Sequence, residues 1–241
     1  MKMANTKILF WDDYKELIVR YLHFYGVSIS YPQDLMMELE RQIQRCYVKN
    51  KLYKGLEVRL SFFLPKGELI YMIEVHHENQ EIYLFDNTKL ELIEHKQLYK
   101  TRSLLSSHSI GAEKIWCMAQ AKCSRSGQIP LILDEKQNIL EVPHANLFLI
   151  GLEKQVCTPH LSLGVCANPA RDFTIRLLEQ MGYEVKEIEE LKADDLLQMR
   201  ELFVVNDLLG VRPITSFQQQ RYLRIEGNQI AQAFAKTVID S

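Results

Sequence analysis

A single carboxylate, Glu141, interrupts an otherwise apolar stretch of the sequence. Residues 131–140 have the pattern of a strand, a turn and the start of a second strand, and the apolar pair Leu147 and Phe148 follows soon after. Burying a carboxylate among apolar residues is costly unless a cation contacts it. The sequence therefore predicts a cationic partner for Glu141, the alternative being an acid that ends its strand in solvent.

Other polar residues with possible chemistry surround Glu141 in a definite order. Lys100 lies 141 − 100 = 41 residues before it, just ahead of an expected helix, and Asn146 lies five residues after it. Arg171 stands near the start of a later helix, and Asn206 follows an apolar strand.

In this order and spacing, residues 99–214 resemble the class IV aminotransferase family, which comprises fold-type IV pyridoxal-phosphate enzymes. The resemblance covers about half of the chain. Asn206, followed by Gly210-Val211 and Pro213, looks more like aminodeoxychorismate lyase than like branched-chain aminotransferases. The resemblance implies a D-amino acid aminotransferase-like fold, an active site between two domains and a homodimer.

The resemblance also implies a role for each polar residue. Lys100 would bond covalently to the cofactor, and Glu141 would keep its pyridine nitrogen protonated. Asn146, Arg171 and Asn206 would complete the cofactor site, with Arg171 in the helix start that binds the cofactor phosphate. The alternatives are a surface lysine for Lys100, a structural amide for Asn146 and a structural ion pair for Arg171.

The separation of Lys100 from Glu141 is longer than usual in the family by roughly two helical turns. Whole turns inserted in the intervening helix would keep its faces in register. The alternative is that the family's lysine position now falls near Ser106 or Ser107, so that the lysine is lost.

Three further features depart from the family pattern. Pro169, in the helix start expected to bind phosphate, has no N–H to donate. Asp207 stands where the family has a small hydroxyl or alanine, and its charge would repel a phosphate. Leu17 takes the place of the family's N-terminal arginine, for which Arg20 could substitute. Arg59, on an expected strand, matches an arginine that binds the substrate carboxylate.

Hydrophobic periodicity predicts an α/β protein with two domains, residues 1–95 and 96–241. The first is expected to be a small α+β domain. The resemblance implies that the second, which carries the cofactor-site motifs, is a larger α/β pseudo-barrel. Helices are expected at residues 11–25, 33–49, 103–122, 169–181, 192–198 and 228–238. Strands are expected at residues 56–64, 68–76, 81–84, 129–133, 139–142, 147–150, 183–187 and 201–205.

Composition limits the class of protein. A net charge of −2 gives no indication of a nucleic-acid or membrane partner. The polar N-terminus lacks the apolar segment of a signal peptide, so a cytoplasmic location is expected. The five cysteines form no C-x-x-C pair and the histidines suggest no ligand set, so no metal is expected.

Two functions follow from the resemblance. The first is a pyridoxal-phosphate enzyme that converts 4-amino-4-deoxychorismate to 4-aminobenzoate and pyruvate, or that transaminates a related amino acid. The alternative is a degenerate family member that has lost the cofactor and binds a ligand or a protein.

Overall fold

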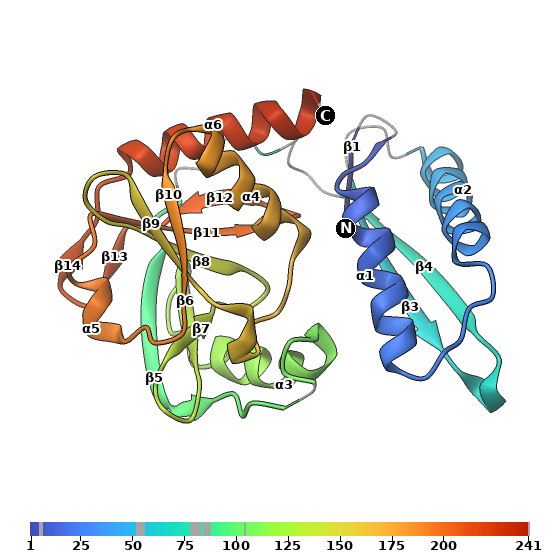
Figure 1. Cartoon of the computed structure of the whole chain (residues 1–241), viewed down its shortest axis with the longest axis horizontal. Helices are drawn as coiled ribbons and strands as arrows, with labels where there is room; N and C mark the ends of the chain where they lie inside the picture. The colour runs from blue at the N-terminus through green and yellow to red at the C-terminus, as the bar shows by residue number, and fades with distance from the viewer. Residues whose placement is uncertain (5–6, 52–55, 78–82, 84–87, 104, 241) are drawn as a thin grey trace. The chain divides into compact units, whose positions relative to one another are not determined.

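The structure, a computed structural model, describes residues 1–4, 7–51, 56–77, 83, 88–103 and 105–240. The chain divides into two compact units, Met1–Leu84 and Phe85–Ser241 (Figure 1). This boundary falls earlier than the expected one between residues 95 and 96, because Glu91–Tyr99 forms one strand, β5, that pairs with β6 of the second unit. The strand expected at residues 81–84 lies, apart from Tyr83, outside the described residues.

The first unit is an antiparallel sheet covered by two helices. The strand order is β2-β1-β3-β4. Its elements are β1 (Lys2–Ala4), β2 (Lys7–Ile8), α1 (Trp11–Phe24), α2 (Pro32–Asn50), β3 (Leu56–Phe63), the 3-10 turn η1 (Pro65–Gly67) and β4 (Ile70–His77). Both helices occur where the apolar spacing predicts them.

The core of the first unit lies between these helices and the sheet. Ile18 of α1 and Leu39 of α2 are buried against Val58 of β3. The indole of Trp11 donates a hydrogen bond to Glu40 Oε2 over 2.9 Å, which joins the two helices. The apolar face of each helix is thus buried within the unit.

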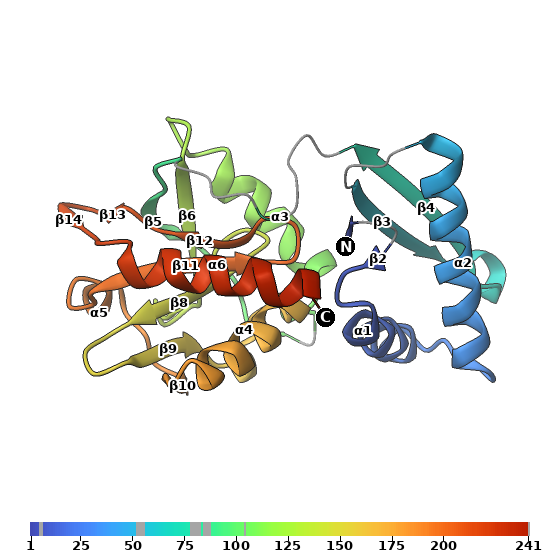
Figure 2. The ribbon, with the colours of Figure 1, turned by 90° about the horizontal axis from the view of Figure 1, so that it is seen from above.

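The second unit contains two five-stranded sheets, ordered β10-β9-β8-β11-β12 and β14-β13-β5-β6-β7. Leu131 and Leu133 of one sheet share a buried core with Leu147, Leu149 and Leu202 of the other. Helix α6 packs along β12 and β11 (Figure 2). The further elements are β6 (Gln128–Leu133), β7 (Ile139–Glu141), β8 (Asn146–Ile150), β9 (Gln155–Pro159), η2 (Leu161–Leu163), β10 (Glu184–Ile188), β11 (Glu201–Asn206), β12 (Gly210–Pro213), β13 (Ser216–Phe217), β14 (Gln220–Arg221), α3 (Ser109–Gln120), α4 (Pro169–Gln180), α5 (Ala193–Leu196) and α6 (Ile225–Asp240).

Helix α3 begins at Ser109, six residues later than the expected start at residue 103. Ser103 Oγ instead accepts a hydrogen bond from the N–H of Leu105, and Ser106 N donates to Ser103 O. A serine hydroxyl that bonds to nearby backbone favours a turn over a helix. The extra residues between Lys100 and Glu141 therefore include this turn as well as α3.

Helix α6 begins earlier than the expected residue 228. The buried carboxylate of Glu201 in β11 accepts hydrogen bonds from the N–H groups of Ile225, Glu226 and Gly227 over 2.8, 3.1 and 2.8 Å. These are the unpaired donors of a helix start, and a negative charge there is favourable. The side chain that fixes the start of α6 thus comes from a distant strand.

Within the described ranges, no helix has the length and apolar character needed to cross a membrane. The same ranges contain no cluster of three or more histidine, cysteine or acidic side chains that could hold a metal ion.

Candidate active site

Lys100 and Glu141 form an ion pair inside the second unit. Lys100 Nζ lies 2.7 Å from Glu141 Oε1, and the two residues are 5% and 1% exposed. Sheet pairing brings them together, because β5 runs parallel to β6, and β6 pairs antiparallel with β7, which ends at Glu141. The N–H of Lys100 also donates to Leu133 O over 2.7 Å. Lys100 is therefore the cation that Glu141 requires, and it is not a surface lysine.

Two residues that sequence reasoning missed complete the surroundings of Glu141. Trp116 Nε1 of α3 donates to Oε1 over 2.9 Å, and the backbone N–H of Cys166 donates to Oε2 over 2.6 Å. The carboxylate thus accepts hydrogen bonds from three directions, which fixes its orientation. The helical spacing that places Trp116 on the buried face of α3 was the one available signal for it.

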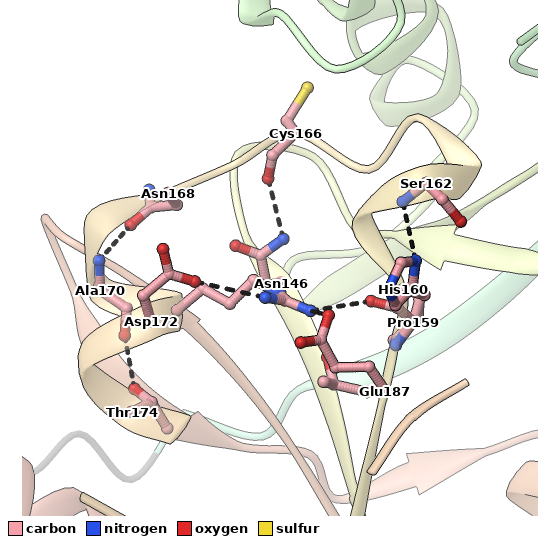
Figure 3. A network of polar contacts seen from close by, with 12 residues as sticks. Asn146, Pro159, His160, Ser162, Cys166, Asn168, Ala170, Asp172, Thr174 and Glu187 are labelled. Carbon is pink, nitrogen blue, oxygen red and sulfur yellow. Dashed lines mark hydrogen bonds and ion pairs between the residues drawn. The ribbon is translucent and has the colours of Figure 1, made fainter. Parts of the chain in front are cut away.

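Cys166 connects several of these groups. Its Sγ lies 3.6 Å from Lys100 Nζ, and its carbonyl accepts a hydrogen bond from Asn146 Nδ2 over 3.0 Å (Figure 3). Burial, together with the charge of Glu141, raises the pKa of the Cys166 thiol to about 12. At neutral pH the side chain is therefore an uncharged thiol next to the ammonium of Lys100.

Asn146 stands at the start of β8 and is buried. Its amide nitrogen bonds to Cys166, whereas its Oδ1 is buried with no hydrogen-bond partner in the described part of the chain. The hydrogen bond to Cys166 is a structural contact, which is the alternative role expected for Asn146. The orphaned oxygen is a polar atom that a ligand could satisfy.

Arg171 lies in the first turn of α4 and is 1% exposed. Its guanidinium binds Glu187 Oε2 at 2.7 Å, the carbonyl of Pro159 at 3.1 Å and Asp172 Oδ1 at 3.3 Å (Figure 3). These contacts tie α4 to β9 and β10. They are the contacts of a structural ion pair.

Asp207, just after strand β11, contacts the residue that precedes helix α4. Asn168 Oδ1 accepts from the N–H of Ala170 over 2.8 Å, and Asn168 Nδ2 donates to Asp207 Oδ1 over 3.2 Å. The neighbouring Asn206 uses its Oδ1 to accept from the N–H of Leu209, which holds the turn between β11 and β12. Asp207 and the segment around Pro169, two of the three departures from the family pattern, are therefore in contact.

The remaining predicted site residues belong to the first unit. Arg20 is exposed on α1, where it lines a surface groove together with Met36. Arg59 is exposed on β3 and lies 3.8 Å from Glu57 Oε1. The ion pair of Lys100 and Glu141 belongs to the second unit.

Comparison with known proteins identifies the family and the fold of the chain. The family model described as amino-transferase class IV matches residues 1–217 of this chain. The chain belongs to the class IV aminotransferase family. The resemblance inferred from residues 99–214 is thereby confirmed, and it extends into the N-terminal half of the chain.

Among curated proteins, this member of the class IV aminotransferase family is similar to an aminodeoxychorismate lyase from Vibrio harveyi. The two are 35% identical over 83 residues, which is 34% of this chain and 30% of the relative. The match thus spans less than a third of that protein's length.

Solved structures confirm the expected fold. A branched-chain aminotransferase from Thermoproteus uzoniensis superposes with a TM-score of 0.80 at 16% identity, covering 99% of this chain and 84% of the other. A putative 4-amino-4-deoxychorismate lyase from Legionella pneumophila gives 0.71 at 19% identity, covering 98% and 88%. The chain therefore has the fold of these class IV aminotransferases.

Proposed function

We propose that this chain is a pyridoxal-phosphate-type enzyme that acts on an amino-acid substrate through Lys100 and Glu141. The observation that carries the proposal is the buried ion pair, with 2.7 Å between Lys100 Nζ and Glu141 Oε1. Paired ionisable groups that are buried this deeply are costly, and they cluster at functional sites.

Lys100 and Glu141 would suit the two ends of a pyridoxal ring, whose aldehyde and nitrogen are para to each other, so their direct 2.7 Å contact would have to open to admit the ring. Lys100 supplies an amine that can bond to an aldehyde, and Glu141 supplies a carboxylate that can hold a proton on a ring nitrogen. The orphaned Oδ1 of Asn146 is a further buried acceptor. When bound, such a cofactor supplies an electron sink for a negative charge at the substrate Cα.

Residues of the chain would position the Glu141 carboxylate and transfer the proton. Trp116 and Cys166 hold the Glu141 carboxylate in place through the hydrogen bonds described above. Lys100 Nζ would move the proton at the substrate Cα, because a freed amine is a suitable general base. Burial of Lys100 and Glu141 keeps water from competing with these interactions.

The substrate we propose is 4-amino-4-deoxychorismate, which would be converted to 4-aminobenzoate and pyruvate. The local similarity to an aminodeoxychorismate lyase supports this over a transamination, although only part of the chain matches. Arg59 would bind a substrate carboxylate, and Arg20 would contribute to the cofactor site. We propose a homodimer as the active form, because the family builds its site from both subunits; light scattering on the purified protein would test it.

The experiment is to add pyridoxal phosphate to the purified protein and to record the absorption near the visible edge. Borohydride reduction followed by peptide mass spectrometry would then locate the modified lysine. We expect modification of Lys100, its loss in Lys100→Ala, and its retention in the control Lys114→Ala, which removes an exposed lysine of α3. Absence of modification at Lys100 would favour the alternative, a binding protein on an inherited fold.

A further inference from the structure

The start of helix α4 differs from an anion-binding helix start. In the class IV resemblance, the backbone N–H groups at this point hold the 5′-phosphate of the cofactor. A helix start binds a phosphate when its first N–H groups are free to point at it and the local charge is not negative. In this chain neither condition is met.

The first N–H groups of α4 are already used. Pro169, the first residue of the helix, has no N–H. The N–H of Ala170 donates to the side chain of Asn168 over 2.8 Å, and the N–H of Arg171 donates to the carbonyl of Asn168 over 2.9 Å. Asn168 therefore caps the helix in the place of a ligand.

The charge near this helix start is also unfavourable for an anion. Asp207, 7% exposed, places a carboxylate oxygen 3.2 Å from Asn168 Nδ2. Both Nη atoms of the Arg171 guanidinium are occupied, Nη1 by Asp172 and Nη2 by Glu187 and the carbonyl of Pro159, whereas its Nε is buried without a hydrogen-bond partner in the described part of the chain. A phosphate at this position would lie beside the Asp207 carboxylate, and the two Nη atoms of Arg171 are already committed to other groups.

We propose that the contact between Asn168 and Asp207 closes the phosphate position, so that this site binds the pyridoxal ring without favouring the 5′-phosphate. The inference rests on the proposed function and specifies the form of the cofactor. Ligands of the 3-hydroxypyridine-4-aldehyde class that lack a phosphate should bind about as tightly as pyridoxal phosphate. Two charge-assisted hydrogen bonds to a phosphate would instead favour the phosphorylated form by at least about 100-fold.

The test compares pyridoxal phosphate with 5′-deoxypyridoxal, which carries a methyl group in place of the phosphate arm. Apparent Kd values for the wild-type chain come from the absorption of the lysine-bound form, and borohydride trapping identifies Lys100 as the lysine. We expect the two Kd values to agree within about threefold. This comparison needs no variant, so it does not depend on how any variant folds.

The double variant Asn168→Gly, Asp207→Ser provides the complementary test. It frees the N–H of Ala170 and replaces a carboxylate with a hydroxyl, and glycine is tolerated at a helix N-cap. One charge-assisted hydrogen bond corresponds to at least about tenfold in affinity. We expect that gain for pyridoxal phosphate and none for 5′-deoxypyridoxal. Glu179→Gln, which alters an exposed acid near the other end of α4, is the matched control and should leave both Kd values unchanged.

The possible outcomes separate this inference from the proposed function. A wild-type preference for pyridoxal phosphate of 100-fold or more overturns the inference and leaves the function intact. Equal Kd values for the two aldehydes in the wild type, together with a gain for pyridoxal phosphate alone in the double variant, support the closed position. If neither aldehyde labels Lys100 in either protein, the function and the inference are both overturned.

Discussion

Removing the ammonium of Lys100 should destabilise the second unit strongly. In Lys100→Met the carboxylate of Glu141, 1% exposed, keeps the hydrogen bonds from Trp116 and Cys166 but loses its only ion-pair partner among the described residues. Breaking a buried pair from one side typically costs about 3–5 kcal/mol, because the remaining charge stays desolvated. We expect a loss of that size in the free energy of unfolding.

A double-mutant cycle in urea separates this effect from a simple loss of packing. In Lys100→Met, Glu141→Gln the neutral amide can still accept from Trp116, and neither charge is left alone. The double variant should therefore be more stable than the sum of the two single losses predicts, by at least about 2 kcal/mol. Lys114→Met, at an exposed position of α3, is the control and should change stability by less than about 0.5 kcal/mol. A loss below about 1 kcal/mol in Lys100→Met would refute the reasoning, since it would mean that the pair is not desolvated.

Further predictions concern other contacts in the second unit. Trp116→Phe removes a hydrogen bond to the charged Glu141 and should cost about 1.5–3 kcal/mol in urea unfolding. The raised pKa of Cys166 keeps it a thiol from pH 7 to well above pH 9, so iodoacetamide should label the exposed Cys117 first. Cys166 should react only as the pH nears 12 or the protein unfolds, and early labelling at pH 8 would contradict its raised pKa. Glu201→Ala leaves three N–H groups of α6 unpaired and should cost at least about 3 kcal/mol, visible as faster hydrogen exchange at the start of that helix.

Local signals predicted the elements whose cause lies within a few residues. Apolar spacing and Pro32 located α1 and α2, and Gly26, with a φ of +77°, follows the end of α1 as a glycine is expected to do. The turn before β4 and the hairpin between β8 and β9 also follow from nearby residues.

Features that depend on residues far apart in the sequence were not predicted. The start of α6 depends on Glu201, which lies 24 residues before the first helical N–H that it binds. The pairing of β13 with β5 joins segments more than 120 residues apart. In the site, the sequence indicated that Glu141 needs a cation, but only the sheet order shows that Lys100 is this cation and that Trp116 and Cys166 share the carboxylate.

The two tryptophans of the chain are divided between the units. Trp11 joins α1 to α2 in the first unit, and Trp116 binds the carboxylate of Glu141 in the second. Each unit therefore contains one tryptophan. In a Trp11→Phe variant, emission excited where tyrosine does not absorb reports on the surroundings of Trp116 and Glu141, without any added label. Comparing its unfolding curve with that of the wild type would show whether the two units unfold as one cooperative body or in separate steps.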